Sequence, residues 1–175
     1  HTRRKNLLLR DLDELVNQQL AKMLFANPQR IDYYDRYQEI IDAYNAEQNR
    51  ATIEKTFMDL MELASSLDTE QQRYVREGFS SDEELSVYDL LFSENLTKQE
   101  IETIKKVSVD LLTKIKQQIA KLDHWTDKQE TKAIVDNLIR KTLWQELPNS
   151  YDVSDIQTYQ KKIYEYVYMR YPEVA

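Results

Sequence analysis

The chain has 175 residues, enough for one sizeable domain with its own apolar core. It holds one glycine, three prolines and no cysteine, which leaves little material for turns and excludes disulfide bonds and thiolate chemistry. Its net charge is −7, and no apolar run is long enough to cross a membrane. This composition predicts an all-α protein of a reducing compartment, and we expect it in the cytoplasm.

The first part of the sequence predicts a short tail and two helices. Residues 1–6 are basic and are expected to fray, whereas residues 7–175 are expected to form a single helical domain. A stripe of Leu, Val and Met over residues 8–24 indicates the first helix. Asn27 and Pro28 then have the order of an N-cap and a first helical residue, so a second helix follows.

The middle of the sequence is strongly acidic. The spacing allows one long helix over residues 51–77, or a break in it at Asp68-Thr69, and Gly78 suits its C-terminal cap. Ser81 to Glu84 have the form of a capping box. Residues 51–100 contain four Lys and Arg against twelve Asp and Glu. A surface with that charge repels phosphates, which argues against nucleic-acid binding by this part of the chain.

Residues 97–147 predict two long helices joined by the short segment 123–125. Thr97 and Glu100 form a capping box at the start of the first helix, and Leu147-Pro148 ends the second. So short a connection predicts antiparallel neighbours, and hence a multi-helix bundle of about six to eight helices organised around a central antiparallel helical hairpin. The tryptophans Trp125 and Trp144 are expected to flank this hairpin, and four apolar residues are expected to be buried at its centre: Leu111, Ile115, Ile134 and Leu138.

Tyrosines form two stripes at helical spacing, one near each end of the chain. Tyrosine is favoured where one protein surface meets another, because it gives a large contact area at low entropic cost. The sequence therefore predicts protein interaction by these stripes; the alternative is that packing within the domain buries them. The stripe residues are Tyr33 and Tyr37 in the second helix, and Tyr164, Tyr168 and Tyr171 in the last helix, which is expected from residue 154 onward.

The familiar signatures of catalytic and metal sites are missing from the sequence. A single glycine excludes a phosphate-binding loop and a dinucleotide fingerprint. The only histidines are His1 and His124, too few for a zinc or di-iron motif or a Ser-His-Asp triad. Asp123, Glu130 and Lys132 resemble a nuclease motif, but the latter two would lie on different sides of one helix. We therefore expect no catalytic, cofactor-binding or metal-binding residue in this chain.

Four local sequences, taken in order, resemble a known family. They are Asn27-Pro28-Gln29-Arg30 leading to Ile40-Ile41-Asp42-Ala43-Tyr44-Asn45, Arg76-Glu77-Gly78-Phe79 leading to Leu85-Ser86-Val87-Tyr88-Asp89-Leu90-Leu91, His124-Trp125 with a helix ending at Leu147-Pro148, and Val167-Tyr168-Met169-Arg170-Tyr171. Together they resemble the C-terminal helical region of the restriction (R, or motor) subunit of type I restriction–modification enzymes.

This resemblance implies that the chain is a piece of a larger protein, which also fits a sequence that begins with His1 rather than Met. The parent chain is implied to be an ATP-dependent type I site-specific deoxyribonuclease, with a nuclease domain and a motor that uses ATP and Mg²⁺. The helical region is implied to be a non-catalytic docking and coupling domain. Its implied partners are the modification and specificity subunits of the methyltransferase core, with DNA contacted through the parent complex.

Two other functional classes remain open from the residues alone. A free-standing helical adaptor for protein interaction fits the same composition. A helical nucleic-acid-binding module fits less well, because the middle of the chain is acidic and the lysines between residues 105 and 121 spread around their helix.

Overall fold

The structure is a computed structural model that describes the backbone of residues 2–173 and the side chains of residues 4–173. These residues form eight α-helices and two short 3₁₀ helices and include no β-strand, so the predicted all-α bundle of six to eight helices is confirmed. None of the helices in the described range is long and apolar enough to cross a membrane.

The chain divides into two compact units, His1–Gly78 and Phe79–Ala175. The single domain predicted over residues 7–175 stays a prediction, because the presence of two compact units does not show whether they unfold together. The first helix begins at Thr2. Fraying of residues 1–6 concerns motion, which a single structure does not test, so it also stays a prediction. His1 lies outside the described residues.

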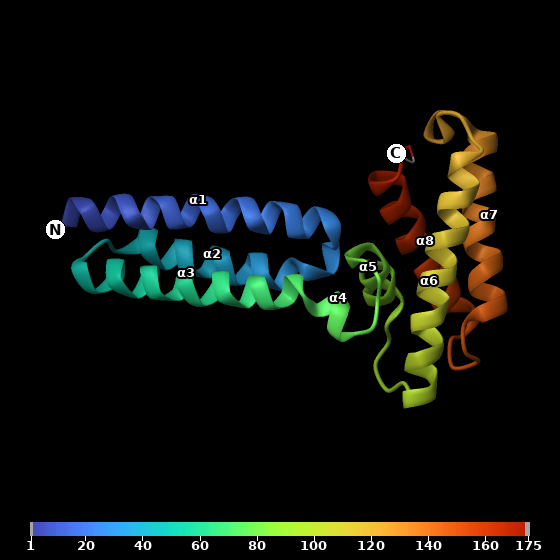
Figure 1. Cartoon of the computed structure of the whole chain (residues 1–175), viewed down its shortest axis with the longest axis horizontal. Coiled ribbons are helices and arrows are strands. Elements are labelled where there is room, and N and C mark those ends of the chain that lie inside the picture. The colour runs from blue at the N-terminus through green and yellow to red at the C-terminus, as the bar shows by residue number, and fades with distance from the viewer. Residues whose placement is uncertain (1, 174–175) are drawn as a thin grey trace. The chain divides into compact units, whose positions relative to one another are not determined.

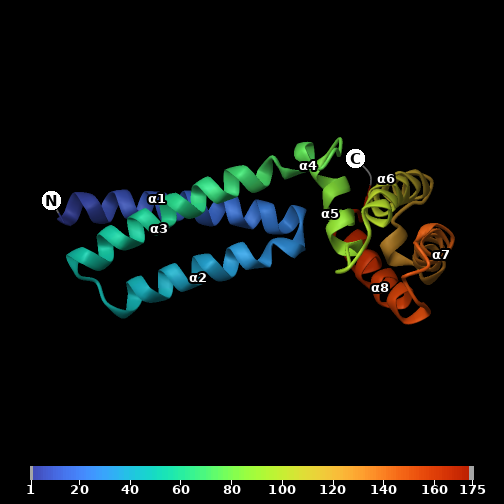
Figure 2. The ribbon, with the colours of Figure 1, turned by 90° about the horizontal axis from the view of Figure 1, so that it is seen from below.

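The N-terminal unit consists of three long helices and a terminal helical turn. The helix α3 packs against both α1 and α2 (Figure 1), and Figure 2 shows the same helices from below. The core between them is aliphatic and includes the buried residues Val16, Leu20, Leu60, Leu63 and Leu67. The elements are α1 (Thr2–Ala26), the 3₁₀ helix η1 (Pro28–Arg30), α2 (Ile31–Ala46), α3 (Arg50–Gln71) and α4 (Arg73–Arg76).

Two side-chain hydrogen bonds show the register of α1 against α3. Lys5 Nζ lies 2.8 Å from Glu54 Oε1, and Gln19 Nε2 lies 3.1 Å from Asp68 Oδ1. Both pairs are 49 residues apart in sequence. The two helices therefore run in the same direction, and residues 2–22 of α1 lie level with the residues of α3 that come 49 positions later.

A buried ion-pair network joins η1 to α3 and α4. Arg30 Nε lies 3.1 Å from Glu70 Oε2, and Arg73 Nε lies 2.7 Å from Glu70 Oε1. Arg30 also donates a hydrogen bond of 3.4 Å to the carbonyl of Met23 at the end of α1. Because Arg30 and Glu70 are both buried, water compensates their charges poorly, and this network offsets the cost of burying them.

The C-terminal unit consists of four helices around a second core. In this unit α6 packs against α5 and α7, and α8 packs against α7 and α5 (Figure 1). The core includes Leu85, Leu91, Leu111, Ile115, Ile139 and Ile163. The elements are α5 (Asp82–Leu91), α6 (Lys98–Ala120), the 3₁₀ helix η2 (Trp125–Asp127), α7 (Gln129–Glu146) and α8 (Val153–Arg170).

The two helices of the predicted hairpin contact each other, and the first begins as predicted. The Thr97 hydroxyl accepts a hydrogen bond from the Glu100 amide, and the Glu100 carboxylate accepts one from the Thr97 amide. Leu111 and Ile115 are buried, as expected. The central position of this hairpin in the whole chain is not confirmed, since the N-terminal unit has a core of its own.

The predicted inner face of α7 is wrong by one residue. Ile134 is exposed and Leu138 is only partly buried, whereas the following residues, Val135 and Ile139, are fully buried. Each position offers two adjacent apolar residues, so two faces about 100° apart show the same four-residue spacing. The packing of α7 against α6 and α8 buries the face that carries Val135 and Ile139.

The two tryptophans beside this pair of helices have opposite environments. Trp125 is completely buried, and its Nε1 donates a hydrogen bond of 2.7 Å to the carbonyl of Tyr171. Trp144 is 49% exposed. Only Trp125 is therefore part of the core.

Glu83 links α5 to α6 and makes the stability of this unit sensitive to acid. Its Oε2 lies 2.6 Å from Lys116 Nζ. Burial on its own raises the pKa of Glu83, but the hydrogen bond and positive charge of Lys116, with smaller effects of other neighbours, outweigh burial and leave this pKa below its ordinary value. The ionised form therefore stabilises the fold above the pKa of an unfolded glutamate, about 4.3, and this contribution is lost as the pH falls through the folded pKa.

We expect Glu83→Gln to destabilise the chain at neutral pH and to have progressively less effect in acid. The measurement is urea unfolding of both proteins from neutral pH down to about pH 3, which lies below the ordinary glutamate pKa. Glu94→Gln is the matched control, because Glu94 is exposed. A stability difference that stays constant across this range would show that the ion pair does not supply it.

Candidate docking surfaces

The tyrosines of the last helix pack partly onto the core of the C-terminal unit. Tyr164 and Tyr168 place their rings edge-on to Trp125, with centroids 6.1 and 5.8 Å from it. Tyr171 is buried, and its ring lies 5.4 Å from Lys116 Nζ. Burial raises the pKa values of Tyr164 and Tyr171. Tyr168, at 39% exposed, is the most accessible member of this stripe.

The two tyrosines of α2 also differ in exposure. Tyr37 is buried, and its hydroxyl donates a hydrogen bond of 2.5 Å to Asp13 of α1. Burial, with a smaller effect of Asp13, raises the pKa of Tyr37. Tyr33 is partly exposed, and the Arg36 guanidinium lies 5.9 Å from its ring. Tyr37 therefore joins two helices within the unit, and the interaction role of all five tyrosines stays a prediction.

A different surface of the N-terminal unit is both apolar and exposed. The register of α1 against α3 places Leu8 beside Phe57 and Leu12 beside Met61. Leu8 and Met61 are each about half exposed, and Leu15 and Met58 are more exposed still, at 64% and 70%. We call this surface the α1–α3 strip and define it by Leu8, Leu12, Leu15, Phe57, Met58 and Met61.

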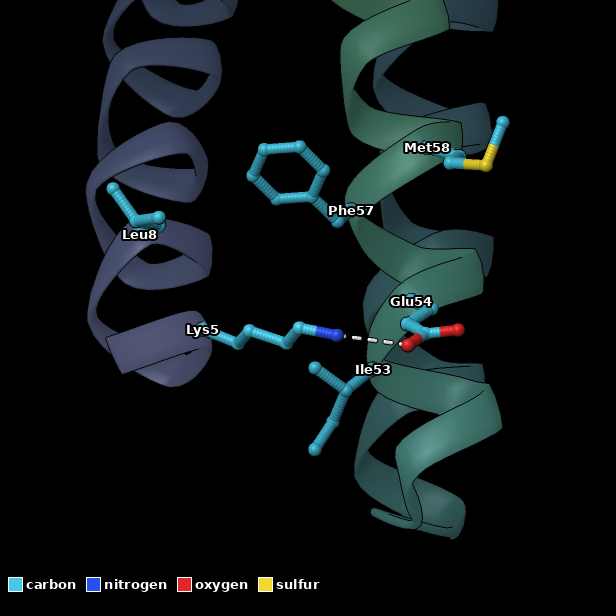
Figure 3. A pocket seen from close by; sticks show the side chains of 6 residues that line it. All are labelled: Lys5, Leu8, Ile53, Glu54, Phe57 and Met58. Atoms are coloured by element: carbon cyan, nitrogen blue, oxygen red, sulfur yellow. Dashed lines mark hydrogen bonds and ion pairs between the residues drawn. The ribbon is translucent and has the colours of Figure 1, made fainter. Parts of the chain in front are cut away.

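One end of the α1–α3 strip is hollowed. An open groove of about 360 Å³ lies there, and the ring of Phe57 projects into the space between the two helices (Figure 3). The ion pair of Lys5 and Glu54 crosses this end, so the groove has an apolar lining with one charged bridge. Such a surface suits an apolar partner, and methionine at position 58 can adapt its shape to what covers it.

The α1–α3 strip was not predicted from the sequence. Leu8 and Leu15 belong to the apolar stripe predicted for the first helix, in which Val16, Leu20 and Met23 are buried and Leu12 and Leu24 are partly buried. The width of that stripe could have indicated the exposed surface, because it exceeds what one neighbouring helix covers. Met58 and Met61 gave no such signal, since their exposure depends on a helix that lies 49 residues away in sequence.

Metal-ligating side chains do not gather anywhere in the described part of the chain. No group of three or more His, Asp or Glu residues there could hold an ion. In the described part of the chain, the candidate binding surfaces are therefore the α1–α3 strip and the exposed side chains of α7 and α8.

Comparison with known proteins assigns the chain to a family. Residues 1–171 match the family described as type I restriction enzyme HindI endonuclease subunit-like, C-terminal. No curated protein and no solved structure matches the chain. Because the match covers nearly the whole sequence, the chain belongs to the family of C-terminal domains of type I restriction enzyme HindI endonuclease subunit-like proteins.

Proposed function

We propose that this region is the docking domain by which a type I restriction subunit binds the modification and specificity subunits of the methyltransferase core. Membership of an endonuclease-subunit family supports a role within a multi-subunit complex, since such a subunit works together with other subunits. In this proposal the nuclease and the ATP- and Mg²⁺-dependent motor lie in the parent chain, which contacts DNA in the cytoplasm. The helical region contributes binding and coupling, and no catalytic group.

The observation that carries the proposal is the exposed α1–α3 strip. A soluble protein seldom leaves several large aliphatic and thioether side chains together in water, and a contiguous patch of this kind marks an interaction site. Leu8, Met58 and Met61 do not contribute to the buried core, so their presence is not explained by the stability of the unit. Covering them with an apolar face of a partner subunit removes that surface from water and favours assembly.

We expect Leu8→Asp combined with Met58→Asp to weaken binding to the purified methyltransferase core by about tenfold or more, because two carboxylates would be desolvated at the interface. Both side chains are at least half exposed, so the melting temperature should change little. The measurement is titration calorimetry of the chain against the core, with thermal unfolding alongside.

Val75→Asp is the matched control, because Val75 is similarly exposed but lies on α4, outside the α1–α3 strip. It should bind as the wild type does. Equal affinity of the double variant and the wild type would remove the strip from the interface, whereas equal weakening by Val75→Asp would indicate a general effect of added negative charge.

A further inference from the structure

The helix α7 has a second face that its own unit does not cover. Its inner side is formed by Val135, Ile139 and Leu143, all completely buried. On another side, Ile134 is 42% exposed and Trp144 is 49% exposed. They lie ten residues apart, about 15 Å along the helix, and Asn137 and Lys141 continue the same stripe between them. A helix with apolar residues on two faces is suited to pack on two sides.

Cations surround the exposed tryptophan. An open hollow of about 560 Å³ lies on this face and is lined by Asn137, Arg140, Lys141, Trp144 and Gln145, with no carboxylate among them. Within the described residues, neither Arg140 nor Lys141 makes an ion pair or a side-chain hydrogen bond. On α6, by contrast, Lys114 pairs with Asp110 and Glu146.

The chemistry of this hollow favours a carboxylate-bearing segment of a protein. The Arg140 guanidinium can bind a carboxylate through two parallel hydrogen bonds, and the indole of Trp144 offers a flat apolar surface beside it. Arginine and tryptophan are also the residue types that most often dominate the binding energy of protein interfaces. The amides of Asn137 and Gln145 can pair with peptide groups at the rim.

A nucleic acid fits this face less well. The hollow offers two cations, whereas affinity for a phosphate backbone increases with the number of phosphates neutralised. Residues 79–175 contain thirteen Lys and Arg against seventeen Asp and Glu, so the unit as a whole carries a charge of −4 and repels a polyanion. A short acidic segment carries far less charge and meets only the local positive patch.

We propose that this face of α7, with Trp144 as its anchor and Arg140 and Lys141 as its anion-binding groups, docks an acidic segment of the methyltransferase core. This inference rests on the proposed docking function and adds a contact in the C-terminal unit that is separate from the α1–α3 strip. The acidic segment places an apolar side chain on the indole and carboxylates on the two cations.

Charge reversal and removal of the anchor test this inference. We expect Arg140→Glu with Lys141→Glu, and separately Trp144→Ala, to weaken binding of the chain to the purified core by about tenfold or more. The charge-reversed protein should also lose most of the decrease in affinity that added salt causes in the wild type. The control is Lys132→Glu, a reversal on the same helix outside the hollow, which should bind nearly as the wild type does.

The possible outcomes separate this inference from the function on which it rests. Failure of the wild-type chain to bind the core would contradict the docking function itself. Binding by the wild type with unchanged affinity in both α7 variants would overturn the α7 site alone. Tight binding of an oligothymidine by the wild type, lost in Trp144→Ala, would identify the site as one for single-stranded DNA and would overturn the protein-segment proposal.

Discussion

Trp125→Ala should lower the free energy of unfolding by about 3–5 kcal/mol, the loss expected when a large buried aromatic side chain is truncated. Trp125 is completely buried and donates a hydrogen bond to the Tyr171 carbonyl. Its ring also contacts the edges of Tyr164 and Tyr168. The substitution removes these contacts together and leaves the Tyr171 carbonyl without its donor, which adds to the cost of the cavity.

The same substitution at the other tryptophan gives the control. Trp144 is half exposed, and we expect Trp144→Ala to change the free energy of unfolding by less than about 1 kcal/mol. The measurement is urea unfolding followed by circular dichroism at the helical band, since tryptophan fluorescence changes in both variants. Equal destabilisation by the two substitutions would contradict the packing described for η2 and α8.

Glu70→Ala should also cost about 3–5 kcal/mol, because it removes the buried carboxylate that pairs with the buried Arg30 guanidinium. Arg73 lies at the same carboxylate, at 2.7 Å, but is partly exposed and can turn to water. The loss therefore falls mainly on Arg30, which also donates a hydrogen bond to the carbonyl of Met23. We expect the whole N-terminal unit to be destabilised, since this network joins η1 to α3.

Two further variants separate charge from volume at this position. Glu70→Gln keeps the shape and some hydrogen bonding but removes the charge, and it should be destabilising but less so than Glu70→Ala. Glu62→Ala changes an exposed glutamate on the same helix and should have little effect. Urea unfolding compares all three with the wild type, and a Glu70→Ala protein as stable as Glu62→Ala would show that the ion pair contributes nothing to the fold.

The sequence was informative where local chemistry decides the structure. The low content of glycine and proline and the helical spacing of apolar residues predicted an all-α protein, and the structure confirms it. The capping box of Thr97 and Glu100 forms as predicted, because it depends only on residues three positions apart. The last helix was expected from residue 154 onward, but a capping box of Asp152 and Asp155 starts α8 at Val153. Several polar residues in a row leave such a boundary undecided.

Features that depend on distant parts of the chain could not be predicted. Adjacent apolar pairs in α7 gave two equivalent faces, and packing against α6 and α8 buries the one that carries Val135 and Ile139. The α1–α3 strip depends on a register between residues 49 apart, which no local pattern contains. For the tyrosines, the spacing placed Tyr164 and Tyr168 on one side of the helix but could not show that Trp125 would lie against their rings.

In the proposed function, this region binds the methyltransferase core without help from the nuclease or the motor. The most direct measurement is sedimentation velocity of the purified 175-residue chain mixed with purified modification and specificity subunits, in the absence of ATP and DNA. We expect a stable complex that contains both the chain and the core, and competition by excess chain for the binding of the complete restriction subunit. Separate sedimentation of chain and core at micromolar concentrations, with no competition, would contradict it.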